Sequence, residues 1–225
     1  MVATGEKVVL GGTAVTLRAM QRLPLVIGFL TLAAFASADD WKPLWDGKSL
    51  NGWHAIGKGK WTIEQGIIVG RHSRDEKEFG HLVTNAVFGD FTVRVHYKTI
   101  AGNSGLYFRI EEGGFSGVSG LQAEIDPQAD TGGLYETNGR AWLVKPKPED
   151  VNRWFKPGEW NELIITAYQT KIVVTVNGQK TAEIDDEKGR LKGRIALQLH
   201  GGQDGLIYFR EIEIQGEPVL SLIHI

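Results

Sequence analysis

Apolar and polar residues alternate in short runs through most of the chain between residues 41 and 215, as they do in residues 91–97. The alternation has a period of two, and no apolar period of 3.6 residues persists, so the pattern predicts strands and no long helix. The predicted strands are residues 61–63, 66–69, 81–84, 91–99, 105–110, 120–125, 160–168, 171–176, 179–184, 193–200 and 205–214.

Turn residues separate these strands. Asn177-Gly178 follows the strand that ends at Val176, and Asn-Gly is the strongest short hairpin signal because both central residues of that turn need a positive φ. Residues 142–156 contain Pro146 and Pro148 and are predicted to be a long loop. So many short strands cannot form one flat sheet, so we expect an all-β domain, either two packed antiparallel sheets or a barrel.

The composition narrows the function classes. The chain has 29 Gly, 7 Trp and 9 Phe, as expected of many strands joined by tight turns. It has no Cys, which excludes disulfides, thiolate metal sites and cysteine nucleophiles. The formal net charge is −2, so no basic field is present for nucleic acid or anionic lipid, and we expect neither as a partner.

The N-terminal region resembles a secretory signal. Residues 23–35 are apolar, Arg22 precedes them, and Ala36-Ser37-Ala38 supplies a small-residue cleavage site. An apolar run of about 13 residues is shorter than the ~20 that span a bilayer, so we expect no stable membrane anchor. The predicted start is Met20, with cleavage after Ala38 and export to the periplasm or medium. A single domain is expected over residues 39–216, followed by a tail (217–225) whose residues 220–225 match a translated sequencing adapter.

Three strands have an unusual polar face. In the strand at 120–125, Gln122, Glu124 and the following Asp126 lie on one face, opposite an apolar set. The same sorting places Tyr107 and Arg109 on one neighbouring strand, and Gln198 and His200 on another. Ordinary solvent-facing strands are also polar, but they are usually richer in Lys and Thr. If the three strands adjoin in one sheet, these side chains form a cluster.

Two carboxylates at positions i and i+2, Glu124 and Asp126, lie about 6.7 Å apart along a strand. That spacing falls between those of retaining and inverting glycosidases and does not choose between them. With His200, the same two residues are acceptable ligands for a divalent cation, although their spacing is no metal motif. Asp126 precedes Pro127, so it can instead cap a turn.

Several motifs, taken together in this order, resemble the 3-keto-disaccharide hydrolase domain family, a relative of concanavalin A-like lectins and glucanases. The motifs span residues 41–214 and are Leu44-Trp45-Asp46-Gly47, Asn103-Ser104-Gly105-Leu106-Tyr107-Phe108-Arg109, Thr131-Gly132-Gly133-Leu134-Tyr135, Pro157-Gly158-Glu159-Trp160-Asn161, Leu197-Gln198-Leu199-His200-Gly201 and Phe209-Arg210-Glu211-Ile212. The resemblance implies a two-sheet jelly-roll sandwich, bacterial export and action on sugars oxidised at C3. The chain departs from the family in one strand, where Glu-x-Gln-Ile-x-Asp is usual and Gln122-Ala123-Glu124-Ile125-Asp126 stands here.

The resemblance also implies a mechanism. A ketone at C3 acidifies the C2 hydrogen, so a base can remove it, expel the C1 substituent and let water add back. Glu124 or His200 would be the base. Arg109, and a divalent cation if one binds, would stabilise the oxyanion. The expected catalytic residues are Glu124, His200, Arg109 and Asp126, and the expected sugar-binding residues are Gln122, Gln198, Tyr107, Tyr135, Glu136, Arg140 and Trp142.

Two other functions are compatible with a sandwich fold. One is a noncatalytic carbohydrate-binding or interaction module, since fold alone does not fix function. The other is direct hydrolysis of unoxidised β-glucans, which is disfavoured because no Glu-x-Asp-x-x-Glu strand occurs.

Overall fold

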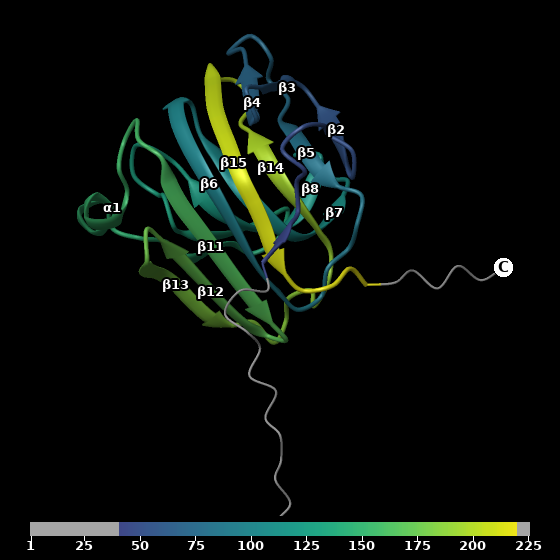
Figure 1. Cartoon of the computed structure of the whole chain (residues 1–225). Coiled ribbons are helices and arrows are strands. Elements are labelled where there is room, and N and C mark those ends of the chain that lie inside the picture. The colour runs from purple at the N-terminus through teal and green to yellow at the C-terminus, as the bar shows by residue number, and fades with distance from the viewer. Residues whose placement is uncertain (1–40, 220–225) are drawn as a thin grey trace, which may run out of the picture. The chain divides into compact units, whose positions relative to one another are not determined.

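Two antiparallel β-sheets lie face to face in the computed structural model, which describes residues 41–219 (Figure 1). The eight-stranded sheet has the order β13 (Gln179–Asp185), β12 (Lys171–Val176), β11 (Asn161–Tyr168), β6 (Phe91–Ala101), β15 (Gly205–Gln215), β4 (Ile67–His72) and β3 (Lys60–Glu64), with β1 (Lys42–Pro43) paired to β15. The seven-stranded sheet has the order β10 (Ala141–Val144), β9 (Leu134–Thr137), β8 (Val118–Ile125), β7 (Ser104–Glu112), β14 (Arg194–Leu199), β5 (Gly80–Thr84) and β2 (Trp53–Gly57). The prediction of an antiparallel two-sheet sandwich is confirmed.

The core between the sheets follows from the period-two pattern. Along β6, Val93, Val95 and Tyr97 are buried and the residues between them are half-buried. Leu106 and Phe108 of β7 meet this layer from the other sheet in the same hydrophobic cluster. Each fully buried side chain of this size contributes roughly 1.5–3 kcal/mol, so this apolar layer is the main source of stability.

The prediction of a long loop over residues 142–156 is wrong. The segment contains β10 and a helix, α1 (Pro148–Trp154). Pro148 stands in the first turn of α1, where its missing N–H costs nothing, and Glu149 and Asp150 follow it there. The prolines therefore mark a helix start. Three further short strands, β1, β2 and β9, were also not predicted.

The ends of the chain lie largely outside the described residues, including the predicted signal segment at 20–38 and the adapter-like residues 220–225. Of the predicted tail, residues 217–219 are described: Pro218 pairs with Phe88, and the Val219 N–H donates to the Val87 carbonyl at 2.8 Å. Within residues 41–219, no helix is long and apolar enough to cross a membrane.

The seven-stranded sheet is covered on both faces. A strand in a two-layer sandwich should be buried on one face, yet nearly every residue of β7, β8 and β14 is buried. On the face away from the main core, a second cluster covers part of the sheet, consisting of Val83, Tyr107, Ile110, Val118 and Ala196. The remaining part of that face contains polar side chains, and it forms the candidate site.

Candidate functional site

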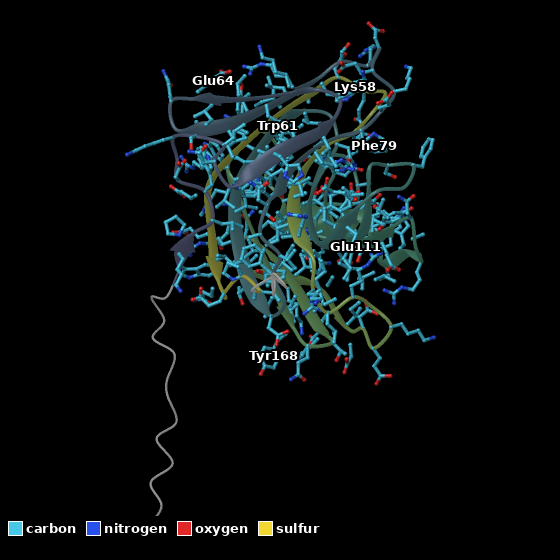
Figure 2. The ribbon with its side chains drawn as sticks, turned by 90° about the vertical axis from the view of Figure 1, so that its right-hand side faces the viewer. Lys58, Trp61, Glu64, Phe79, Glu111 and Tyr168 are labelled. Atoms are coloured by element: carbon cyan, nitrogen blue, oxygen red, sulfur yellow. The ribbon has the colours of Figure 1, made fainter. Side chains whose placement is uncertain are left out.

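A cavity of about 330 Å³ lies on this second face of the seven-stranded sheet. That volume is at the small end of the roughly 300–1,000 Å³ range of ligand pockets. Figure 2 labels Phe79, which is part of the cavity wall, toward the opposite end of the molecule from Tyr168. The lining residues come from β7, β8, β9, β10, β14 and the adjoining loops: Phe79, Asn103, Tyr107, Ser116, Gln122, Glu124, Asp130, Tyr135, Thr137, Asn138, Trp142, Gln198 and His200.

A chain of hydrogen bonds forms the cavity floor. Gln122 Nε2 donates to Gln198 Oε1 at 3.1 Å, and Gln198 Nε2 donates to the Tyr107 hydroxyl at 3.2 Å. The Tyr107 hydroxyl lies 2.8 Å from Thr137 Oγ1. All four side chains are buried, so the bonds fix their rotamers before any ligand arrives. This floor is preorganised for a polar ligand.

Gly105 makes the floor possible. Gln122 on β8 and Gln198 on β14 are separated by β7, so their side chains meet across that strand. A Cβ on Gly105 would stand 2.3 Å from Gln122 Nε2, well inside contact distance. Glycine therefore leaves the space through which the two amides meet.

Glu124 is the titratable group with the largest shift in the cavity. Its side chain is 6% exposed, and burial raises its pKa from the usual 4.5 to about 8. Asn103 Nδ2 donates to Oε1 at 2.6 Å and opposes that rise, whereas the charges of Asp126 and Asp130 add to it. At neutral pH the carboxyl therefore carries a proton that it can donate.

His200 lies at the same end of the cavity. Its ring packs edge-on against Phe79, with centroids 4.6 Å apart. Nδ1 lies 2.8 Å from the Gly201 carbonyl, which can only accept, so Nδ1 holds the proton in the neutral ring and Nε2 is then the accepting nitrogen. Asn103 links the two residues, because its backbone carbonyl accepts from the His200 backbone N–H at 3.4 Å while its side-chain amide donates to the Glu124 carboxyl.

Aromatic and charged residues form the wall on the β9–β10 side. Tyr135 and Trp142 pack edge to face with centroids 5.2 Å apart. Lys145 Nζ lies 4.9 Å from the Trp142 ring centroid and 3.6 Å from Asp130 Oδ2. Sugars present C–H groups to such ring faces and hydroxyls to such charges, so this wall suits a carbohydrate.

The expectation that Arg109 joins the cluster is wrong. A bulge interrupts the pairing of β7 with both neighbours at this point, and Arg109 has a φ of +50°. The bulge turns its side chain away from the cavity. The guanidinium is 1% exposed and donates to the carbonyls of Gln169 at 2.7 Å and Gly89 at 3.2 Å. Arg109 therefore stabilises the fold at this edge.

Three other expected residues also lie outside the cavity lining. Asp126 accepts a hydrogen bond from the Gln128 N–H at 2.9 Å, as a turn-capping carboxylate does. Arg140 forms a bidentate pair with Asp186, at 2.6 and 2.8 Å, and also contacts Glu136. Glu136 follows Tyr135 on β9, and successive strand residues face opposite sides.

The expected metal ligands do not gather. Within residues 41–219, no three His, Asp or Glu side chains are placed to hold a metal ion. The Asp126 carboxylate accepts a hydrogen bond from the backbone of its own turn, at Gln128. It therefore does not join Glu124 and His200 as a third ligand.

Residues 40–215 match the profile of the 3-keto-alpha-glucoside-1,2-lyase-like domain over most of the chain. The chain belongs to this family. A curated relative named 3-keto-disaccharide hydrolase, from Bacteroides thetaiotaomicron, is 27% identical over an alignment of 172 positions that covers 65% of this chain and 59% of that protein. The chain thus spans about three-fifths of the length of the curated relative it matches.

Several solved structures share the fold of this protein. A candidate glycosyl hydrolase from Parabacteroides distasonis has a TM-score of 0.58 at 20% identity, covering 79% of this chain and 94% of that one. The carbohydrate-binding module CBM66 from Bacillus subtilis has a TM-score of 0.55 at 18% identity, covering 73% and 96%. At these identities the likeness concerns the sandwich fold alone.

The sequence patterns missed several lining residues of this family member, namely Phe79, Asn103, Ser116, Asp130, Thr137 and Asn138. Asn103 could have been predicted from the sequence, since alternation places it on the same face as Tyr107. The others lie in loops or on β9, where no periodic pattern extends far enough to fix which way a side chain points.

Proposed function

We propose that this protein is an exported enzyme that cleaves 3-keto-glycosides, with Glu124 as general acid and His200 as general base. The observation that supports this most directly is the buried Glu124 carboxyl, whose pKa of about 8 keeps it protonated at neutral pH at the same end of the cavity as His200. The family, and the name of the curated relative, support the substrate class.

In the first half of the reaction, His200 Nε2 takes the C2 proton, and the C–H electrons move to form an enolate with the C3 carbonyl. The enolate then re-forms the ketone, a C1–C2 double bond forms, and the C1–O bond breaks. Glu124 donates its proton to the departing oxygen. The products are the free leaving group and an unsaturated 3-keto sugar, with His200 protonated and Glu124 ionised.

In the second half, water adds to C1. The Glu124 carboxylate takes a proton from that water, and His200 returns the C2 proton, so both residues recover their starting states. The net reaction is hydrolysis. Asn103 contacts both residues and would hold the acid and the base in register across the reacting carbons.

The enolate oxygen needs a hydrogen-bond donor other than Arg109. Gln198 Nε2 uses one hydrogen on the Tyr107 hydroxyl and has a second one available. Gln122 contributes an amide oxygen to the same floor, which suits a sugar hydroxyl. Because the floor is already fixed, these groups need not reorganise when charge develops on the substrate.

The proposal can be tested with leaving groups of different acidity. In single-turnover assays of leaving-group release, Glu124→Gln should abolish release from a 3-keto-disaccharide, whose leaving alcohol needs a proton, but should spare release from a 4-nitrophenyl 3-keto-glucoside, whose phenolate departs unaided. Single-turnover conditions are needed because the later addition of water also uses Glu124. His200→Gln should abolish both. Exposed Glu159 offers a matched control, and Glu159→Gln should change neither rate. Equal loss of both substrates in Glu124→Gln would contradict the acid role.

Two further measurements address the alternatives. Assays with and without chelator test whether a divalent cation takes part. Sugar binding without turnover of any oxidised or ordinary glycoside would support a carbohydrate-binding module. The signal-like residues 20–38 support export. N-terminal sequencing of the secreted protein should therefore show that the residues up to Ala38 have been removed.

A further inference from the structure

Phe115 stands at the tip of the β7–β8 hairpin with 95% of its surface exposed. It has the greatest exposure among the large apolar residues of residues 41–219 that lie in solvent. A single exposed apolar residue is ordinary on a protein surface, so its position relative to the cavity determines whether it has a role.

The hairpin forms one wall of the cavity. Ser116, directly after Phe115, lines the cavity. Gly117 lies over β5, because a Cβ placed on it would stand 3.7 Å from His81 Nδ1. Val118 is fully buried in the second hydrophobic cluster, so the hairpin is packed down onto the sheet. Phe115 therefore projects from a wall whose base is fixed.

A second contact fixes the hairpin from the β9 side. Asn138, which also lines the cavity, donates from Nδ2 to the Val118 carbonyl at 2.8 Å. Gly114 lies directly under this side chain, since a Cβ there would be 2.5 Å from Asn138 Nδ2. Gly113 and Gly114 both have positive φ, and glycine takes such conformations without strain. The turn can thus present the phenyl ring at the cavity mouth.

The cavity is elongated along the strands. Glu124 and Thr137 both line it, and Thr137 pairs with Gly120, which is four residues from Glu124 along β8, or about 13 Å at ~3.3 Å per residue. Glu124 and His200 are at one end of the lining, and Ser116 and Asn138 are toward the hairpin. This length exceeds one sugar ring, so a ring bound at Glu124 leaves room for a second group toward the hairpin.

We propose that Phe115 is the stacking platform for the leaving group of the substrate, so that the protein favours glycosides with a second pyranose or an aryl group on C1. This inference rests on the proposed function, which determines which end of the substrate lies at Glu124. The 3-keto ring occupies the polar end at Glu124, and the group on C1 extends toward Ser116. The apolar C–H face of a pyranose, or a flat aryl ring, then covers the phenyl ring that water now surrounds.

The test measures binding in a Glu124→Gln background, so that it does not depend on turnover. Calorimetry compares a 3-keto-disaccharide with methyl 3-keto-glucoside, which has the same ring and almost no leaving group. Adding Phe115→Ala should weaken disaccharide binding about three- to tenfold and leave methyl glycoside binding unchanged. Phe115→Tyr should restore the disaccharide affinity.

Tyr168 provides the matched control. It is an aromatic residue that is 61% exposed, and Figure 2 shows it toward the opposite end of the molecule from Phe79. Tyr168→Ala should not change either affinity. An equal effect of Phe115→Ala on both ligands, or no effect on either, would overturn the platform. A change of oligomeric state in Phe115→Ala would also overturn it and assign the ring to a contact between copies.

The proposed function and the platform fail in different ways. If wild-type protein releases no leaving group from either glycoside, but Phe115→Ala selectively weakens disaccharide binding, the enzyme proposal fails and the platform stands as a binding subsite. If turnover is found and the selective effect is not, the platform fails alone.

Discussion

Burial of Glu124 should cost the protein stability at neutral pH. The folded state holds this carboxyl at a pKa of about 8, against the usual 4.5 expected in the unfolded chain. Each unit of difference is worth 1.36 kcal/mol, so the penalty is about 3 kcal/mol at pH 7 and about 5 kcal/mol above pH 8. Glu124→Gln keeps the shape and the acceptor for Asn103 but cannot ionise, and should remove this penalty.

The sign follows from which state holds the proton. Below pH 4.5 the carboxyl is protonated in both states and the penalty is absent. Between pH 4.5 and 8 only the unfolded state releases its proton, so stability falls as the pH rises through this window. Above pH 8 both states are ionised and the difference stays constant.

Urea denaturation at pH 4.5, 7 and 8.5 measures this directly. The stability gained by Glu124→Gln should be near zero at pH 4.5 and should grow with pH. Glu159→Gln, on an exposed turn, should stay within about 0.5 kcal/mol of wild type at each pH. A gain in Glu124→Gln that does not depend on pH would refute the reasoning, because it would arise from packing and not from ionisation.

Three further predictions concern groups near or beneath the cavity. Asn103→Ala removes the hydrogen bond that lowers the pKa of Glu124, so the loss of kcat/KM at alkaline pH should move to higher pH in the pH–rate profile. Arg109→Met should leave KM unchanged and lower the unfolding free energy by about 1–3 kcal/mol, since it removes the charged donor from two partly exposed carbonyls; a raised KM would return Arg109 to the site. Burial lowers the pKa of His81 to about 4, so the contribution of His81 to stability should fall by about 3 kcal/mol between pH 6.5 and 4, where only the unfolded state binds a proton. Glu124 acts in the opposite direction over this range, so the effect is measured as the pH-dependent difference between wild type and His81→Phe in urea titrations.

The fold was predictable because period-two alternation reports burial directly. Strand β6 alternates over its whole length, and each apolar residue of Val93, Val95 and Tyr97 faces the core as the pattern requires. The short elements β9, β10 and α1 were not predictable in this way. They are four to seven residues long, so each is too short for a period to be recognised in the sequence.

The site was predictable only as far as the strands stay regular. Gln122, Glu124, Gln198 and Tyr107 share a face, as alternation indicated, because no bulge separates them from their partners. Arg109 lies two residues beyond Tyr107, and the parity rule fails there because the bulge adds a residue to one strand. A bulge depends on pairing with β8 and β14, which are distant in sequence, so local pattern does not reveal it.

The elements that cover the second face of the seven-stranded sheet explain both the proposed role of Glu124 as an acid and the stability that its burial costs. The β9–β10 wall and the loop before it cover the end of the second face where Glu124 lies, and this desolvation is the largest cause of the raised pKa of Glu124. An exposed carboxylate at this position would be ionised at pH 7 and could not protonate a leaving alcohol. The stability lost at Glu124 is therefore the thermodynamic counterpart of its ability to hold a proton at pH 7, and a substitution that opens the β9–β10 wall should lower the pKa of Glu124 and the activity together.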